Sequence, residues 1–317
     1  MRWPEGECEN RVSIIAFWSP LHGQGQTSNL HAMAFAMSIL HKKRVLMMQT
    51  QYDKNNLESP LVGHNVGISS EADELFQDIG LTAAITYSNM SKLSLKLLES
   101  CCLTFHNSNL LLLPGSDIKN RETFDREIGK GVVRMIKSAN ELVDIILIDV
   151  NSGNDELSLR IMSAADLIVI NLSQRRYVLE KFFIDYGERF IENNKVFYLF
   201  GDYDNNSVYN INNFRVKYRK YMNGANSGVI PYCTQYMDAQ NESKVLSFMQ
   251  EGLRVGAKSG WQKVLDSIRR RLKTSRYIAE ETDYFFHQSK QSAENILDML
   301  YISMKNNQRG AGRSEPQ

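Results

Sequence analysis

One stretch near the start of the chain indicates the fold: Ser13-Ile-Ile-Ala-Phe-Trp-Ser-Pro-Leu-His-Gly-Gln-Gly-Gln-Thr-Ser28. A buried strand that runs through a glycine loop into a helix beginning with Thr-Ser is typical of a phosphate-binding loop. Main-chain N–H groups and the positive helix end bind phosphate oxygens in such loops. Gly23 and Gly25 allow close approach of the backbone, and Thr27 is the expected magnesium ligand. The alternative is a tight strand–helix turn without a ligand.

Short apolar runs alternate with longer helical stretches along the rest of the chain, which indicates strand–helix units. The runs lack the alternation of half-exposed strands, so we expect helices on both faces of a mainly parallel sheet. The expected strands are Val12–Trp18, Arg44–Gln49, Leu110–Leu113, Ile145–Val150, Leu167–Leu172 and Val196–Phe200. The expected helices are Thr27–Leu40, Asp125–Ser138, Glu156–Ala164 and Arg176–Glu192. The predicted fold class is an α/β three-layer sandwich, the P-loop NTPase fold.

The composition is that of an ordinary globular protein. The chain has 317 residues, of which 43% are hydrophobic and 23% charged, and a net charge of +1. This balance does not favour wholesale nucleic-acid binding. No apolar run approaches the roughly 20 residues of a membrane span, and we expect neither a secretion signal nor a location outside the cytoplasm. The four cysteines have no metal-ligand spacing and fit a reducing compartment: Cys8, Cys101, Cys102 and Cys233.

The character of the sequence changes at Gly256, where strand-like runs cease. We expect a phosphate-loop domain over residues 1–255, appended helices over 256–305 and a disordered tail over 306–317. The appended helices are predicted at Trp261–Leu272 and Ala279–Lys305.

Two features of this C-terminal part have more than one interpretation. The cations between Arg269 and Arg276 are either a solvated helix end or a contact for an anionic membrane or nucleic acid. An apolar stripe lies on the second helix, and its members are Ile296, Leu297, Leu300, Tyr301 and Met304. The stripe is expected to pack against the domain rather than to enter a membrane, because it lacks interleaved lysines.

The segment Leu21-His-Gly-Gln-Gly-Gln-Thr-Ser28 resembles the deviant Walker A motif of the ParA/MinD family of P-loop ATPases. The family pattern is Lys-Gly-Gly-x-Gly-Lys-Thr-Thr. Leu21 and Gln26 therefore stand where the family has two lysines. In the family, the first lysine reaches the nucleotide of the partner subunit, and the second meets the β and γ phosphates.

The resemblance continues in order over residues 11–250. Gln49 and Gln51 stand where the family has an Asp-x-Asp pair, and the segment Asn55–Glu58 continues the match. Asp149 ends a strand similar to the Walker B strand. Three further matches are Leu110–Ser116, Ala164–Ile170 and Gly228–Tyr232, the last followed by Asp238–Lys244.

The resemblance implies ATP and Mg²⁺ as ligands. Thr27 would bind magnesium directly and Asp149 through water, although an acid ending a buried strand can also cap the next turn. The expected nucleotide-binding residues are Leu21, His22, Gly23, Gln24, Gly25, Gln26, Thr27, Ser28, Pro231 and Tyr232. Pro231 and Tyr232 would line the adenine, and Gly201-Asp202 stands where the family has an asparagine. His22 is either a partial substitute for a lysine when protonated or an ordinary loop histidine.

The missing charges predict slow or absent hydrolysis. The transition state of phosphoryl transfer needs positive groups aimed at the oxygens, and their loss costs orders of magnitude in rate. Gln51 stands where the family has its water-activating aspartate, and it could still orient a water molecule.

Degraded phosphate loops in the family are associated with spatial organisers, and the nearest resemblance is to TadZ/CpaE-like pilus assembly proteins. We therefore expect a nucleotide-responsive scaffold, dimeric across the phosphate-loop face. Its expected partners are components of a pilus or secretion machine, with peripheral contact at the inner face of the membrane or a cell pole. One alternative is an active partition or septum-positioning ATPase. Nucleic-acid binding through the arginine cluster is the least favoured.

Overall fold

A central sheet of eight strands forms the middle layer of the protein. The computed structural model describes residues 13–51, 57–62, 79–105, 108–116, 118, 120–191, 195–257 and 276–311. The strand order is β3-β4-β2-β5-β1-β6-β7-β8, and only β3 runs antiparallel to its neighbour. The strands are β1 Ser13–Trp18, β2 Val45–Gln49, β3 Leu103–Thr104, β4 Leu110–Leu113, β5 Ile145–Asp149, β6 Leu167–Leu172, β7 Val196–Tyr203 and β8 Ser227–Pro231.

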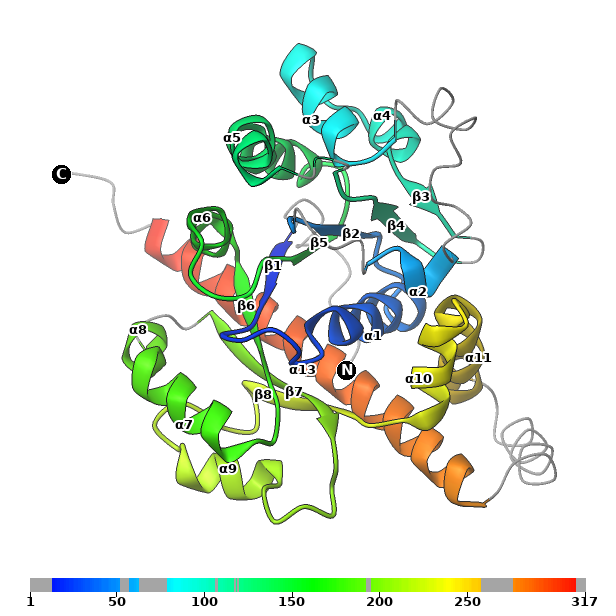
Figure 1. Cartoon of the computed structure of the whole chain (residues 1–317), viewed down its shortest axis with the longest axis vertical. Coiled ribbons are helices and arrows are strands. Elements are labelled where there is room, and N and C mark those ends of the chain that lie inside the picture. The colour runs from blue at the N-terminus through cyan, green and yellow to red at the C-terminus, as the bar shows by residue number, and fades with distance from the viewer. Residues whose placement is uncertain are drawn as a thin grey trace.

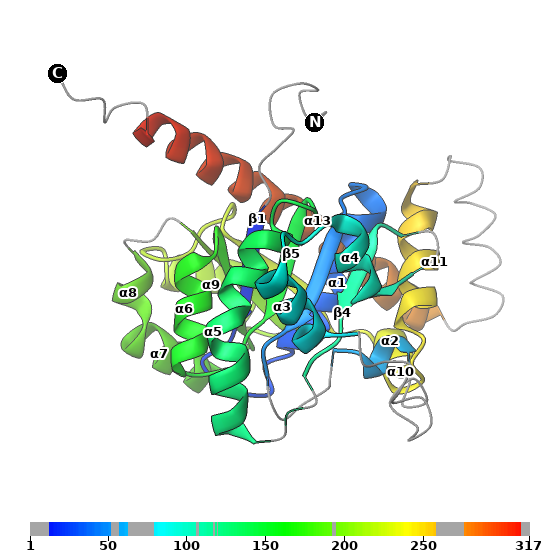
Figure 2. The same ribbon diagram turned by 90° about the horizontal axis from the view of Figure 1, so that it is seen from above.

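Helices cover both faces of this sheet (Figures 1 and 2). One face carries α3 Leu81–Met90, α5 Arg121–Ala139, α6 Glu156–Ala164, α7 Arg176–Asp185 and α9 Ile211–Lys217. The other carries α1 Gln26–Leu40, α10 Thr234–Asn241, α11 Val245–Ala257 and α13 Arg276–Ala311. Three short helices complete the described elements: α2 Ser59–Val62, α4 Leu95–Ser100 and α8 Gly187–Ile191. The predicted α/β sandwich is confirmed.

Successive residues of each central strand enter opposite cores. Ile14, Ala16 and Trp18 pack with α5, α6 and α7, whereas Ile15 and Phe17 pack with α1 and α13. Both sets are buried, which explains why the strands are apolar without alternation.

Helix α1 is buried along most of its length, because the sheet lies on one side of it and α11 and α13 lie on the other. Ala32, Ala34 and Ala36 are fully buried and allow close packing. The helix begins at Gln26, directly after the phosphate loop. Its N-terminus, with the partial positive charge of the helix dipole, is thereby fixed at the carboxyl end of β1.

The C-terminal helix α13 covers the edge strand β8. Ser292 Oγ accepts a hydrogen bond from Val229 N at 3.1 Å and donates one to Val229 O at 3.0 Å. The stripe residues Ile296, Leu297 and Leu300 are buried in the same core as α1. The expectation that the stripe packs against the domain is confirmed for these three; the side chain of Met304 lies outside the described part. No described helix is long and apolar enough to cross a membrane.

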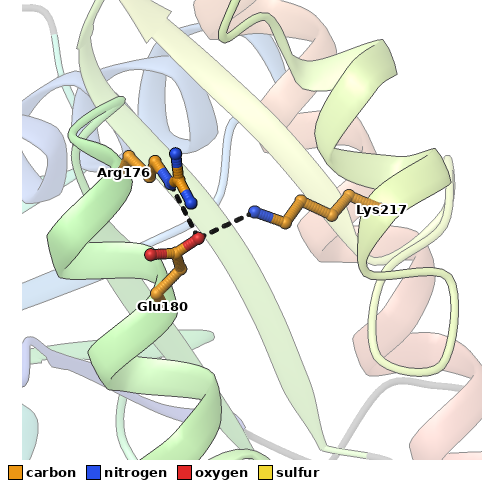
Figure 3. A network of polar contacts seen from close by, with 3 residues as sticks. All are labelled: Arg176, Glu180 and Lys217. Carbon is orange, nitrogen blue, oxygen red and sulfur yellow. Dashed lines mark hydrogen bonds and ion pairs between the residues drawn. The ribbon is translucent and has the colours of Figure 1, made fainter.

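Helices α7 and α9 are joined on the surface by a shared carboxylate (Figure 3). Glu180 Oε1 lies 2.8 Å from Arg176 Nε and 3.0 Å from Lys217 Nζ. All three side chains are solvent-exposed, so this network contributes little to stability.

Several sequence-based elements have other bounds in the structure. The helix predicted over Asp125–Ser138 is α5 Arg121–Ala139, and the strand predicted over Val196–Phe200 is β7, which continues to Tyr203. One helix was predicted over Arg176–Glu192, but the structure has two, α7 and α8, separated at Tyr186. The last helix begins at Arg276 rather than Ala279 and ends at Ala311 rather than Lys305. The predicted helix Trp261–Leu272, and the basic residues Arg269–Lys273 with it, lie outside the described residues.

Candidate phosphate-binding site

The carboxyl ends of three adjacent strands meet beside the loop Ser19–Gly25. Strand β1 lies next to β5, and β5 next to β2, so that Asp149 pairs in register with Phe17 on one side and Gln49 on the other. In open α/β sheets, ligands bind in the crevice beyond this edge. The topology therefore brings Gln49, Gln51 and Asp149 to the start of α1.

Two glycines give the loop its shape. Gly23 has φ 75° and Gly25 has φ 71°, both in the left-handed region that disfavours side chains. A Cβ on Gly25 would also lie 3.8 Å from Asn29 Oδ1 and 3.9 Å from Asp202 Oδ2. Gln24, between them, is buried, and its amide donates to His22 O at 3.3 Å. The loop is thus held as a wide turn that leads directly into α1.

Gln26 and Thr27 both donate hydrogen bonds to Asp149. Gln26 Nε2 lies 2.5 Å from Asp149 Oδ1 and 2.6 Å from Val150 O, and Thr27 Oγ1 lies 2.6 Å from Asp149 Oδ2. Both carboxylate oxygens are therefore bonded to neutral donors, and the amide of Gln26 is directed at protein acceptors.

The environment of Asp149 disfavours its charge. Burial raises its pKa to about 6, against the lowering effect of the hydrogen bonds from Thr27 and Gln26; the carboxylate of Glu58 adds a smaller raising effect. Asp149 has no exposed surface. A cation beside it would reverse this balance.

A cavity of about 460 Å³ opens over the loop and α1. The predicted residues that line it are His22, Gly23, Gly25, Gln26, Thr27, Ser28 and Gln51. None of the described residues that line it is Lys, Arg, Asp or Glu. The cavity therefore offers hydroxyl, amide, imidazole and main-chain groups to a ligand, and its charged group, Asp149, lies beneath the lining.

His31 is a cavity residue that the sequence reasoning missed. It lies one helical turn after Thr27 and lines the cavity while remaining fully buried. Its Nε2 lies 2.9 Å from Leu57 O. Burial lowers its pKa to about 4, and this hydrogen bond has a smaller opposing effect. The i, i+4 spacing from Thr27 was the available signal, because it places both residues on one helix face.

The outer wall of the cavity comes from α2 and α10. Gln240 Nε2 donates to Ser28 Oγ at 2.7 Å, and Tyr236 Oη donates to Ser28 O at 2.7 Å. The lining residues from this wall are Ser59, Pro60, Gln240 and Asn241, and Ser152 completes the lining near β5. No sequence pattern indicates them, since tertiary packing alone brings α10 onto the start of α1.

Gln49 does not line the cavity. Its side chain contacts Glu58, which also accepts a hydrogen bond from the loop after β4. Its Nε2 lies 3.2 and 3.1 Å from the two carboxylate oxygens of Glu58, and Gly115 N donates to Glu58 Oε1 at 2.6 Å. An amide suits this position, because a carboxylate there would face Glu58.

Four of the predicted nucleotide-binding residues lie outside the cavity lining: Leu21, Gln24, Pro231 and Tyr232. Leu21 is half-buried and packs against the core on the α7 face. Pro231 ends β8, and Tyr232, whose N–H donates to Tyr203 O at 3.0 Å, is 44% exposed. Their contact with adenine stays a prediction.

The residues near Asp149 fit a magnesium ion. Thr27 supplies a hydroxyl and Asp149 a carboxylate, which are the oxygen donors that Mg²⁺ prefers. No group of three His, Cys, Asp or Glu side chains converges anywhere in the described ranges. A magnesium ion here would therefore depend on water or ligand oxygens for the rest of its coordination.

Comparison with known proteins supports the fold. No family model matches the chain, and no curated protein matches its sequence. Solved structures do match. The cell division ATPase MinD of Pyrococcus furiosus is 15% identical, covers 90% of this chain and 99% of its own, and has a TM-score of 0.59.

Two further structures agree. A ParA family ATPase from Chlorobium tepidum is 16% identical, with 86% of this chain and 98% of its own covered and a TM-score of 0.59. The septum site-determining protein MinD from Pyrococcus horikoshii, complexed with Mg-ADP, is 17% identical, with coverages of 79% and 98% and a TM-score of 0.54. The chain has the fold of the ParA/MinD-type ATPases.

Proposed function

We propose that this protein is a nucleotide-responsive scaffold of the ParA/MinD type that binds ATP or ADP with Mg²⁺ and hydrolyses ATP slowly or not at all. The observation that carries the proposal is the contact of Gln26 with Asp149. The loop retains the turn, the helix N-terminus and the hydroxyl of a phosphate site, but the side chain that would contact the phosphates is a neutral amide bonded to the protein itself.

Binding and hydrolysis have separate requirements in this site. Main-chain N–H groups at a helix start bind phosphate without any lysine. Hydrolysis needs positive charge on the transferring phosphoryl group and an oriented water. Gln51, half-buried and lining the cavity, is the available group for the water, but none of the described lining residues is a lysine or an arginine that would supply the charge.

Titration of a fluorescent ATP analogue with Mg²⁺ tests the binding half. We expect saturable binding by the wild type, a loss of at least about tenfold in affinity for Thr27→Ala, and retention by Thr27→Ser, which keeps the hydroxyl. Absence of binding by the folded wild type contradicts the proposal.

A single-turnover measurement of ATP hydrolysis tests the second part of the proposal, that hydrolysis is slow or absent. A rate well above the uncatalysed background, stimulated by a partner or by dimerisation, would favour the rival function of an active partition or septum-positioning ATPase. We expect no such rate.

As a scaffold, the protein forms a homodimer across the phosphate-loop face. It also takes part in the assembly of a Tad-type pilus or secretion machine at the cytoplasmic face of the membrane. Resemblance to family members with degraded loops supports this part. Light scattering with and without Mg-nucleotide tests the dimer. Co-purification of a pilus motor or secretin with the full chain, reduced by Thr27→Ala, tests the assembly role; recovery of partition proteins instead would contradict it.

A further inference from the structure

Large apolar side chains are exposed mainly on one surface, which is formed by α7, α9 and the loop that precedes α9; we call it the α7–α9 surface. In the part of the chain that the structure describes, nine large hydrophobic residues are exposed, and five of them lie here: Tyr177, Ile184, Val208, Tyr209 and Val216. Ile184 and Val208 are each 80% exposed and Val216 is 75% exposed, so their side chains project from the surface rather than line a groove. Clustered exposed apolar groups mark contact sites.

Hydrogen bonds attach the loop before α9 to the start of α7. Gln174 Nε2 donates to the carbonyl oxygens of Asp204 and Tyr209, each at 2.9 Å. Asp204 N in turn donates to Gln174 Oε1 at 2.7 Å. Gln174 lies three residues before Tyr177, and Val208 directly precedes Tyr209. The loop therefore presents its two exposed apolar residues beside the first turn of α7.

The two helices lie side by side (Figures 1 and 3). Glu180 of α7 binds Lys217 of α9, with 3.0 Å between Oε1 and Nζ. Ile184 follows Glu180 by one helical turn, and Val216 directly precedes Lys217. This ion pair therefore joins the two segments that carry Ile184 and Val216.

The α7–α9 surface has an excess of positive charge. Over residues 174–189 and 204–221, seven lysine and arginine residues are exposed, against three exposed acidic residues and the half-buried Glu180. Most of these acids bind cations of the same surface: Glu180 with Arg176 and Lys217, Asp185 with Lys181, and Glu188 with Lys220. Arg175, Arg189 and Arg219 are exposed cations outside these pairs. Since the whole chain has a net charge of only +1, the excess is local.

Projecting apolar side chains among cations fit the surface of a membrane that contains anionic lipids, because the apolar groups enter the boundary of the acyl chains while the cations attract the phosphates. A second copy would present the same positive charge and be repelled. Nucleic acid would attract the cations, but Ile184, Val208 and Val216 have no ring to stack on bases. A helix from a partner protein would need an apolar groove, which projecting side chains do not form.

We propose that the α7–α9 surface docks peripherally on a membrane that contains anionic phospholipids. Ile184, Val208 and Val216 enter the headgroup region, and the exposed arginines bind lipid phosphates. The proposal goes beyond the proposed function, because none of these three apolar residues lines the cavity and docking needs no nucleotide.

Sedimentation of the nucleotide-free full chain with lipid vesicles is the first test. We expect binding to vesicles of phosphatidylcholine mixed with phosphatidylglycerol and little binding to vesicles of phosphatidylcholine alone. Binding to the mixed vesicles should fall steeply as salt is raised, because salt screens the attraction between the cations and the anionic headgroups. Failure of the folded wild type to bind the mixed vesicles overturns the proposal.

The apolar contact is tested by Ile184→Ser combined with Val216→Ser. Both side chains are exposed, so the double variant should fold, which circular dichroism checks. We expect its affinity for the mixed vesicles to fall at least about tenfold, because two apolar groups no longer enter the headgroup region. Met90→Ser is the matched control and keeps wild-type binding: Met90 is 78% exposed on α3, and α3 lies far from α7 and α9 (Figure 1). Equal binding by the double variant and the control overturns the apolar contact.

The charge is tested by Arg189→Gln combined with Arg219→Gln, which breaks none of the ion pairs above. We expect a loss of about fivefold in vesicle affinity for each cation removed, together with a weaker dependence on salt. Lys130→Gln combined with Lys137→Gln, at two exposed lysines of α5, is the control and keeps wild-type binding. Equal vesicle affinity of the arginine variant and the lysine control overturns the assignment of the headgroup contact to this surface.

Two further outcomes would assign the surface to another occupant and overturn the proposal. The first is retention on duplex DNA that the arginine variant abolishes, without vesicle binding. The second is a dimer in sedimentation velocity that Ile184→Ser with Val216→Ser dissociates, again without vesicle binding. Nucleotide titration of the same variants should match the wild type, so that this proposal and the proposed function fail separately.

Discussion

The side-chain amide of Gln26 lies 2.5 Å from the carboxylate of Asp149, and this contact joins the phosphate loop to the end of β5 without a cation. A neutral donor leaves a buried carboxylate with little compensation for its desolvation. The raised pKa of Asp149 follows from this arrangement.

Replacing Gln26 by lysine should reverse two properties at once. The ammonium group would pair with Asp149 or with phosphate, so we expect nucleotide affinity to rise by about tenfold or more while the affinity for Mg²⁺ alone falls. Hydrolysis should remain slow, because Leu21 and Gln51 are unchanged. Fluorescence titration and calorimetry measure the two affinities, and Asn205→Lys, at an exposed residue outside the cavity lining, is the control. A parallel change in both affinities would contradict the prediction.

Asp149 should make the protein less stable as pH rises. Its pKa is about 6 in the folded chain and 3.8 in the unfolded chain, so the folded state binds more protons between these values. The free energy of unfolding therefore falls across this window, by roughly 3 kcal/mol in total at two pKa units. When Asp149→Asn is unfolded by urea in EDTA, its free energy of unfolding should not show this decrease with pH. Identical pH slopes for Asp149→Asn and wild type would show that the contribution is absent.

His31 should have the opposite effect over nearly the same range. Its pKa is about 4 when folded and 6.5 when unfolded, so the unfolded state binds more protons and stability rises with pH. The two contributions largely cancel in the wild type. His31→Gln should therefore expose a negative slope between pH 4 and 6, and Asp149→Asn a positive one. Two variants with slopes of the same sign would refute the assignment.

Gly228→Ala should weaken the contact between α13 and the sheet. A Cβ at Gly228 would clash with Ser292 Oγ and lie 3.0 Å from the ring of Phe197, so Ser292 must leave the backbone of Val229. We expect a loss of about 1–3 kcal/mol in the free energy of unfolding. Gly224→Ala, where a Cβ would meet nothing within 4 Å, is the control. Equal stabilities of the two variants would contradict this account.

The sequence predicted the sheet well because its strands are apolar on both sides. Leu110–Leu113 and Leu167–Leu172 have the predicted bounds. The two-residue strand β3 is too short for a pattern to reveal it. The break between α7 and α8 was missed because Tyr186 and Gly187 continue the helical pattern; Gly187 packs so closely on Tyr221 that a Cβ there would lie 2.9 Å from the ring. That contact is tertiary and leaves no local signal.

The sequence predicted most of the residues of the site but not the contacts between their side chains. Thr27 and Asp149 were expected near one another, because the family resemblance implies that both hold one magnesium ion. The sequence could not show that Gln26 would bond to Asp149, because side-chain direction depends on packing. Gln240 and Asn241 come from a helix more than 200 residues further along the chain than Ser28.

Helix α13 is a structural support and not a detachable anchor. Phe285, Ala293 and Ile296 belong to the same core as Phe35 of α1, the helix that carries the phosphate loop at its start. A truncation that deletes α13 to test whether this helix binds a membrane or a partner would expose the side of α1 that packs against it. It would also uncover the edge strand β8. Loss of localisation in such a truncation would therefore report collapse of the candidate phosphate-binding site as readily as loss of a membrane or protein contact.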